Sequence, residues 1–208
     1  NYIVMCTEKG TIKKTLLEAF SRPRNSGINA ININEGDRLL NVSLTNGNNH
    51  IIIAKSSGKV VHFHESDVRP MGRSAAGVRG ITLDHESDRV VNMICVSREN
   101  AQLLVVSEKG YGKRSSLDDY RITRRGGKGV KTINITEKTG NLVAVKEVTE
   151  TDDLMIINKS GITIRIPVAE MRVMGRATQG VRLIRLNEND EISGVEKVEI
   201  EMNGNEHP

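Results

Sequence analysis

Four loops rich in arginine, lysine and glycine carry the clearest binding chemistry in this 208-residue chain. They span residues 21–27, 68–80, 121–131 and 172–182, and each contains at least two cationic side chains. Guanidinium and ammonium groups bind phosphate oxygens, and small residues between them let main-chain amides approach a phosphate as well. The loops therefore predict a surface that binds a polyanion.

The predicted contacts are the cations of these loops together with the glycines of the third loop. They are Arg22, Arg24, Arg69, Arg73, Arg79, Arg121, Arg124, Arg125, Gly126, Gly127, Lys128, Gly129, Lys131, Arg172, Arg176 and Arg182. Duplex DNA carries one negative charge per ~1.7 Å of its axis, so a regular cationic track can hold it without reading its bases. Bending a short duplex by about 40–90° costs on the order of 1–6 kcal/mol, which many phosphate contacts can offset.

Charge is distributed unevenly along the chain, whose net charge is +4. Residues 1–131 hold 21 Lys and Arg against 13 Asp and Glu, whereas residues 132–208 hold 9 against 13. A basic body with an acidic end favours a polyanion partner and a tail that competes for the same surface. The chain has three Tyr, two Phe and no Trp. It therefore lacks the aromatic platforms of single-strand binders, and we expect a duplex partner.

Recurring glycines divide the chain into four repeats of about fifty residues. A turn glycine recurs at spacings of 48, 52 and 51 residues, and a second glycine follows each one after 17, 19, 19 and 19 residues. The turn glycines are Gly10, Gly58, Gly110 and Gly161, and the second glycines are Gly27, Gly77, Gly129 and Gly180. Four short strands per repeat at this period are typical of propeller blades, which must stack to bury their faces.

The predicted fold is all-β and propeller-like, with about four blades of roughly fifty residues. Apolar β-branched runs around the glycine turns predict strands, of which examples are Tyr2–Cys6, Lys59–Phe63, Leu154–Ile157 and Ile162–Ile166. Further strands are expected at Ile28–Ile33, Arg38–Leu44, Val181–Leu186 and Ile192–Val198, and single helical turns at Leu16–Phe20 and Val168–Met171. The expected domain spans 1–201, with repeats 1–49, 50–100, 101–152 and 153–201 and an acidic, polar tail at 202–208.

The third loop resembles the box motif in the C-terminal domain of the bacterial DNA gyrase A protein, usually written Gln-Arg-Arg-Gly-Gly-Lys-Gly. Residues 123–129 match six of its seven positions, with Thr123 in place of Gln. Four other segments resemble blades of the same domain. They are Gly10–Thr15, Gly58–Phe63, Gly77–Ile81 and Gly110–Arg114.

The resemblance implies a β-pinwheel that wraps duplex DNA around its outer rim and biases strand passage toward ATP-dependent negative supercoiling. It also implies a six-bladed domain, of which these repeats resemble the last four, so the box-like run is either the box or a later-blade variant. The expected partners are duplex DNA, the N-terminal region of the gyrase A protein, and the gyrase B protein in an A2B2 complex. We expect no catalytic residue, metal or cofactor in this domain, because ATP and magnesium act elsewhere in the family, and we expect a cytoplasmic protein without a membrane partner.

Three alternatives remain. The corresponding protein of topoisomerase IV has a similar domain with a degenerate box. A propeller that binds protein would expose an aromatic or apolar patch, which the scarcity of aromatics disfavours. A propeller enzyme has His62 and His64 as metal candidates on one strand face, but no Cys or clearly placed carboxylate joins them. Cys6 and Cys95 lie in apolar runs and are expected to be buried thiols.

Overall fold

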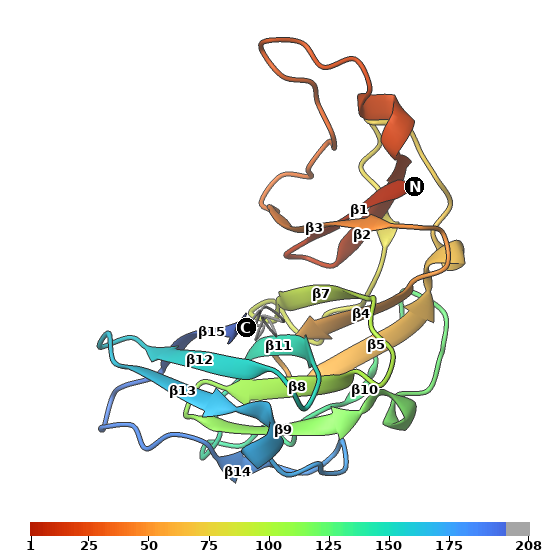
Figure 1. The fold of residues 1–208 in the computed structure, drawn as a ribbon. Coiled ribbons are helices and arrows are strands. Elements are labelled where there is room, and N and C mark those ends of the chain that lie inside the picture. Colours follow the sequence, from red (N-terminus) through yellow and green to blue (C-terminus); the bar gives the residue numbers. More distant parts are fainter. Residues whose placement is uncertain (199–208) are drawn as a thin grey trace, which may run out of the picture.

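The computed structural model describes residues 1–198 and contains four antiparallel β-sheets, which confirms the all-β, propeller-like prediction. The predicted end of the fourth repeat at residue 201 and the tail at 202–208 lie outside the described residues. Figure 1 shows the first sheet, in red, and the fourth sheet, in blue, at opposite ends of the molecule. No helix of residues 1–198 has the length and apolar character that a bilayer crossing requires.

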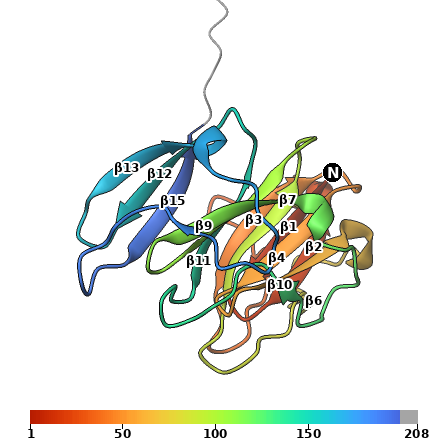
Figure 2. The ribbon, with the colours of Figure 1, turned by 90° about the horizontal axis from the view of Figure 1, so that it is seen from below.

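Each of the first three sheets has four strands, and the fourth has three. The first sheet is ordered β3 (Leu39–Thr45), β1 (Tyr2–Thr7), β2 (Thr11–Leu16), β6 (Val78–Arg79). The second is β7 (Val90–Val96), β4 (His50–Lys55), β5 (Lys59–His64), β10 (Val130–Lys131). The third is β11 (Leu142–Val148), β8 (Gln102–Ser107), β9 (Tyr111–Ser116), β14 (Val181–Arg182). The fourth, whose strands lie together in Figure 2, is β15 (Ile192–Val198), β12 (Asp153–Asn158), β13 (Thr163–Pro167).

The short strands β6, β10 and β14 do not join the sheet of their own repeat. Each pairs with the second hairpin strand of the preceding repeat: β6 with β2, β10 with β5, and β14 with β9. They form one edge of each of the first three sheets, which we call the outer edge, while β3, β7 and β11 form the opposite, inner edge. Neighbouring sheets contact one another through these inner strands, β3 against β7, β7 against β11 and β11 against β15.

Because these short strands pair with the preceding repeat, two of the predicted strands are wrong. The strand expected at Val181–Leu186 contains only Val181–Arg182, because only these two residues reach the edge of the third sheet. The strand expected at Ile28–Ile33 does not form. Its position in the repeat matches that of β6, β10 and β14, but no sheet of an earlier repeat lies beside it in the described structure. The expected helical turns are short 3₁₀ segments, η1 (Leu17–Phe20), η2 (Glu65–Asp67), η3 (Leu117–Asp119) and η4 (Val168–Glu170).

Alternating side chains of the central strands fill separate cores on the two faces of the second and third sheets. Ile51 and Ile53 of β4 are fully buried against the first sheet, whereas Ile52 and Ala54 are fully buried against the third. A strand buried on both faces reads as a continuous apolar run, as residues 51–54 do. The apolar core therefore consists of layers between sheets, and each inner sheet is stabilised by both of its neighbours.

The second glycine of a repeat lets the chain cross the preceding sheet at close range. Gly129 has φ +86°, and a Cβ added there would lie 2.4 Å from the carbonyl oxygen of Val60 in β5. Gly77 and Gly180 have the same relation to Ile12 and Gly112. Gly27 has a similar φ of +82°, but no atom of the described structure lies within 4 Å of an added Cβ. In the second, third and fourth repeats the second glycine is therefore required by a close contact with the preceding repeat.

Alanine substitutions at Gly129 and Gly27 should separate the conformational cost from the steric cost. Both change a residue with positive φ, which costs about 1–2 kcal/mol for a side chain, but only Gly129→Ala places a methyl group against a main-chain oxygen. We expect Gly129→Ala to lower the free energy of unfolding by roughly 3–4 kcal/mol and Gly27→Ala by about 1–2 kcal/mol, measured by urea denaturation. Equal losses would contradict the close approach.

Candidate nucleic-acid interface

The outer edge carries one cation at the same position of three successive sheets. Arg79, Lys131 and Arg182 are each the second residue of the outer strand, and all three side chains are exposed. They pair across to Thr11, Lys59 and Tyr111, respectively. Since the same pairing recurs in each sheet, the geometry of the fold itself sets the spacing of these cations.

Most of the other predicted cations are also exposed. This group contains Arg22, Arg24, Arg69, Arg121, Arg124, Lys128 and Arg172. Within residues 1–198 none of these side chains forms an ion pair or hydrogen bond, because the observed ion pairs involve other lysines and arginines. Their charges are therefore available to an external anion.

Three predicted contacts instead tie successive repeats together. The guanidinium of Arg125 donates to the carbonyl oxygens of Asp67 at 3.2 Å and Arg79 at 3.0 Å. Arg176 repeats this arrangement one sheet further along, with the carbonyl oxygens of Asp119 at 3.2 Å and Lys131 at 2.9 Å. Both side chains are partly buried. Their contacts give them a structural role that the sequence analysis did not predict.

Arg73 occupies the matching position in the second repeat. It donates to the carbonyl oxygen of Asn29 at 3.2 Å, and Asn29 corresponds to Arg79 and Lys131 in the later repeats. Each of the three arginines thus binds the main chain at the outer-strand position of the repeat before it. The arginine lies four residues before the second glycine in every case, a periodicity that was visible in the sequence.

The glycines of the third loop hold its main chain against the second repeat and leave amides exposed. Gly126 has φ +93° and donates its N–H to Gly80 at 2.7 Å, while its carbonyl accepts from Thr82 Oγ1 at 2.6 Å. The carbonyl of Gly127 accepts from the Thr82 amide at 2.9 Å. The amides of Gly127 and Lys128 are in an exposed stretch and have no hydrogen-bond partner in the described part of the chain. Two amides therefore accompany the exposed cations of this loop.

Two buried lysines, Lys113 and Lys13, donate hydrogen bonds to main-chain carbonyl groups of neighbouring loops. The ammonium group of Lys113 lies within hydrogen-bond distance of the carbonyl oxygens of Gly175 at 2.7 Å, Arg176 at 2.5 Å and Thr178 at 2.9 Å. Burial, and then the nearby Arg176, lower the pKa of Lys113 to about 8. Several carbonyl dipoles converging on one nitrogen favour the ammonium form at neutral pH. Lys13 makes the equivalent contact to the carbonyl of Arg73, and it also binds the carbonyl of Ala30.

At the junction that leads to the box-like loop, a histidine makes the inter-repeat contact. His62 Nδ1 lies 2.8 Å from the carbonyl oxygen of Tyr120, and the His62 carbonyl accepts from the amide of Thr123 at 2.8 Å. Because a carbonyl only accepts, Nδ1 of His62 carries the hydrogen. His62 Nε2 then accepts from His50 Nδ1, 3.1 Å away. Lys14 and Arg114 occupy the matching positions at the other two junctions. They donate to the main-chain carbonyl oxygens of Glu65 and Met171, respectively.

The histidines do not form the metal site considered from the sequence. The rings of His62 and His64 both contact that of His50 edge-on, but no group of His, Cys, Asp and Glu side chains in residues 1–198 has the geometry to hold a metal ion.

The prediction of two buried thiols is correct for Cys6, whereas Cys95 is only partly buried. Burial raises the pKa of Cys6 to about 12 and that of Cys95 to about 11, so both are thiols at neutral pH.

A sequence profile described as "DNA gyrase C-terminal domain, beta-propeller" matches residues 1–46, 50–97, 101–149 and 152–199. The chain belongs to this family. It is 46% identical over 199 residues to the DNA gyrase A protein of Staphylococcus aureus strain MRSA252, a match that covers 95% of this chain and 22% of that protein. The chain thus spans about a fifth of the length of the curated relatives it matches.

Two solved structures share the gyrase C-terminal fold of this chain. The C-terminal domain of a DNA topoisomerase IV superposes with a TM-score of 0.88 at 26% identity, covering 95% of this chain and 62% of that one. A DNA gyrase A C-terminal domain superposes with a TM-score of 0.82 at 27% identity, covering 94% and 65%. The gyrase-like propeller fold is therefore supported by both sequence and structure.

Replacing Lys113 by methionine tests the support beneath the fourth loop of this gyrase-family domain. The variant keeps the apolar stem but removes the donor that three carbonyl groups share, and in the described residues that of Arg176 has no other donor, a loss of about 1–3 kcal/mol. We expect urea denaturation to show a loss in that range. Lys128→Met also removes one charge, but from an exposed side chain without a partner, and should leave stability nearly unchanged. A similar effect of the two substitutions would show that the buried ammonium contributes nothing.

Protonation of His62 should make the domain less stable as the pH is lowered. Burial, and then the neighbouring His50, lower the pKa of His62, although its hydrogen bond to Tyr120 opposes the shift. The unfolded chain then binds a proton more readily than the folded chain, so stability is lost as pH falls below about 6.5, the pKa of an unperturbed histidine.

His62→Asn keeps a donor for the Tyr120 carbonyl without titrating. Its free energy of unfolding, compared at pH 7.5 and 5.5, should fall less than that of the wild type. His85→Asn, at an exposed histidine, is the matched control and should retain the full dependence. A wild-type dependence in both variants would assign the effect to other groups.

Proposed function

We propose that this chain binds and bends duplex DNA without sequence preference, as the C-terminal domain of a DNA gyrase A protein. The observation that carries the proposal is the repeated cation at the outer edge, Arg79, Lys131 and Arg182, on three successive sheets. Exposed arginines and lysines without internal partners flank it in every loop. A duplex laid across successive outer edges would meet a cation at each sheet.

The energetics favour phosphate contacts over base contacts. Each neutralised phosphate releases condensed counterions, which supplies affinity that depends on salt and not on sequence. The free amides of Gly127 and Lys128 add donors suited to phosphate oxygens. Bending the duplex costs on the order of 1–6 kcal/mol, and contacts spread over several sheets can offset it.

In the parent complex we propose a supporting role for this domain. The gyrase homology supports membership of an A2B2 assembly, in which the N-terminal region of the gyrase A protein and the gyrase B protein carry out ATP- and magnesium-dependent strand passage. Wrapping by the C-terminal domain would direct that reaction toward negative supercoiling. We propose that the domain itself is non-catalytic, needs no cofactor, and acts in the cytoplasm.

One observation favours a second assignment, to topoisomerase IV. The superposition on a topoisomerase IV C-terminal domain gives the higher of the two TM-scores, 0.88 against 0.82. The 46% identity to a gyrase A protein over nearly the whole chain supports the gyrase assignment more strongly. Both assignments place the domain on duplex DNA, and they differ in whether it wraps the duplex or recognises DNA segments.

Salt-dependent binding to a duplex tests the proposed function. Log affinity should fall linearly with log salt at a slope of about −0.9 for each phosphate contact. The double variant Arg124→Gln/Lys128→Gln should weaken binding to all sequences equally and reduce the magnitude of the slope by about 2. End-to-end energy transfer on a labelled duplex should report bending by the wild type.

A matched control removes the same charge elsewhere. Arg38, which is ion-paired with Glu8, and Arg89 are exposed and precede the inner strands β3 and β7, so Arg38→Gln/Arg89→Gln should bind with an unchanged slope. Equal weakening by the two double variants would mean that net charge, not the outer edge, determines binding. Absence of duplex binding by the wild type at low salt would overturn the proposed function.

A further inference from the structure

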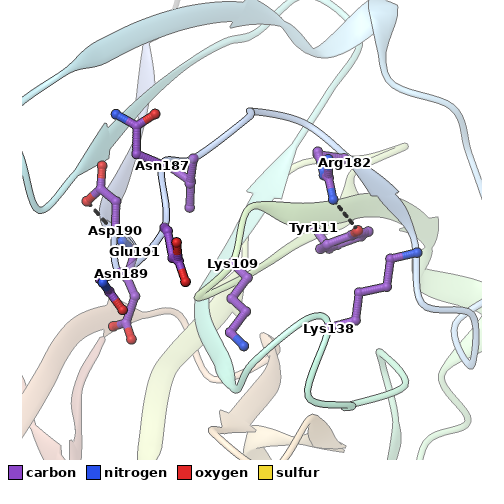
Figure 3. A pocket seen from close by; sticks show the side chains of 10 residues that line it. Lys109, Tyr111, Lys138, Arg182, Asn187, Asn189, Asp190 and Glu191 are labelled. Atoms are coloured by element: carbon purple, nitrogen blue, oxygen red, sulfur yellow. Dashed lines mark hydrogen bonds between the residues drawn. The ribbon is translucent and has the colours of Figure 1, made fainter.

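A groove beside Tyr111 lies at the outer edge of the third sheet, and two of its residues, Tyr111 and Lys138, are not among the contacts that the loops predict. Tyr111 is the first residue of β9 and pairs directly with Arg182 of β14. Lys138, from the loop between β10 and β11, lies on the other side of the ring (Figure 3). Cross-strand pairing thus places the hydroxyl of Tyr111 next to Arg182, one of the three repeated cations of the outer edge.

The contacts of Tyr111 leave a hydrogen-bond donor available. Arg182 donates to the phenol oxygen at 3.0 Å, and its guanidinium carbon lies 5.5 Å from the ring centroid. The Lys138 ammonium also lies 5.5 Å from the centroid. Because the guanidinium has no acceptor atoms, the phenol oxygen must accept from it, and the phenol hydrogen is free to donate to another group.

The two sides of the Tyr111 groove differ in charge. One hollow, of about 410 Å³, is walled by the acidic turn 187–191, whose Asp190 and Glu191 already bind Ser160 and Lys159. The other, of about 730 Å³, is lined by residues 179–185 together with Tyr111 and Lys138 and contains no carboxylate. An anion is favoured in the second hollow, whose lining includes Arg182, Lys138 and Arg185.

The second sheet lacks this arrangement. Lys59 occupies the position of Tyr111 there, and its ammonium is paired with Asp84 at 2.9 Å. Asp84 also binds the buried Lys55 at 2.9 Å. Asp84 thus holds the ammonium groups of both lysines at this point of the second sheet, whereas the two cations that contact Tyr111 have no carboxylate partner among the described residues. The third sheet is therefore the better placed of the two to hold an additional anion.

We propose that the Tyr111 groove binds one backbone phosphate of duplex DNA, with Lys138 and Arg182 as the cationic contacts and the Tyr111 hydroxyl as a neutral donor. The inference rests on the proposed function and extends it by two residues, Tyr111 and Lys138. The groove includes residues 179–182 of the fourth loop, so a duplex bound to the outer strand β14 would lie next to it.

Two variants of the 208-residue chain distinguish the roles of these residues in duplex binding. Lys138→Gln removes a charge and should reduce the magnitude of the salt slope by about 0.9. Tyr111→Phe keeps the ring but removes the neutral donor, so it should raise the Kd about 2- to 10-fold with the salt slope unchanged. Arg38→Gln, the control of equal charge beside the inner strand β3, should change neither quantity.

The anion source is tested on the same proteins with inorganic phosphate. The ring signals of Tyr111 in an NMR spectrum, assigned through their loss in Tyr111→Phe, should shift on adding duplex DNA. If wild type binds duplex but both variants match Arg38→Gln, the groove proposal is overturned and the proposed function stands. If the duplex does not bind but inorganic phosphate shifts the Tyr111 signals, the groove takes free anions and its assignment to DNA is overturned along with the proposed function. Circular dichroism and thermal unfolding of each variant show whether the fold is intact.

Discussion

The completion of each sheet by a strand from the next repeat is the interaction on which the rest of the structure depends. Two residues, such as Val130 and Lys131, form the outer edge of a sheet that belongs to the repeat before them. The glycine that precedes them makes this possible, because the main chain of the preceding sheet occupies the space a Cβ would need. The same pairing fixes the cation of each outer strand in a constant relation to its sheet.

Side chains on both sides of a junction reinforce this exchange. From the preceding repeat, Lys113 reaches carbonyl groups of the following loop, and His62 does so at the junction before it. From the following repeat, Arg125 and Arg176 reach back to carbonyl groups of the repeat before. The cationic residues of one loop therefore divide into two kinds, illustrated by Arg124, which is exposed, and its neighbour Arg125, which binds the main chain. A charged loop held in this way presents its free cations from a fixed position.

Much of the fold followed from spacing and local pattern. The recurring offset of 17–19 residues between the two glycines of each repeat predicted the blades, and apolar β-branched runs around the glycine turns predicted strands such as Tyr2–Cys6 and Lys59–Phe63, which lie within β1 and β5. The sheet that a short strand joins cannot be predicted in the same way. A two-residue strand such as Val78–Arg79 or Val181–Arg182 carries no pattern that distinguishes the sheet of its own repeat from that of the preceding one. The expected strand at Ile28–Ile33 was wrong for that reason, since strand formation there depends on a neighbour and not on the segment itself.

The candidate site was predictable in composition but not in division of roles. Arginine density located the loops, yet nothing in a single loop separates a guanidinium that meets main-chain oxygens from one that meets solvent. Comparison of the repeats offered a signal, because Arg73, Arg125 and Arg176 share one offset from the second glycine. No binding role was predicted for Tyr111, and the sequence held no sign that Lys138 and Arg182 flank it, since they come from different segments.

The borrowed outer strand also bears on how such an array can change its length during evolution. In most repeat proteins a unit can be lost or gained with its sheet intact, and stability changes by one unit and one interface. Here the strands of neighbouring sheets interlock along the sequence, so no single break point separates two complete sheets. Deletion of the last repeat would remove the edge strand of the one before it and leave an unpaired edge that invites misassembly, whereas after deletion of an internal repeat the equivalent strand of the next repeat can take that place. Repeats should therefore be lost less readily from the C-terminal end of such an array than from its interior.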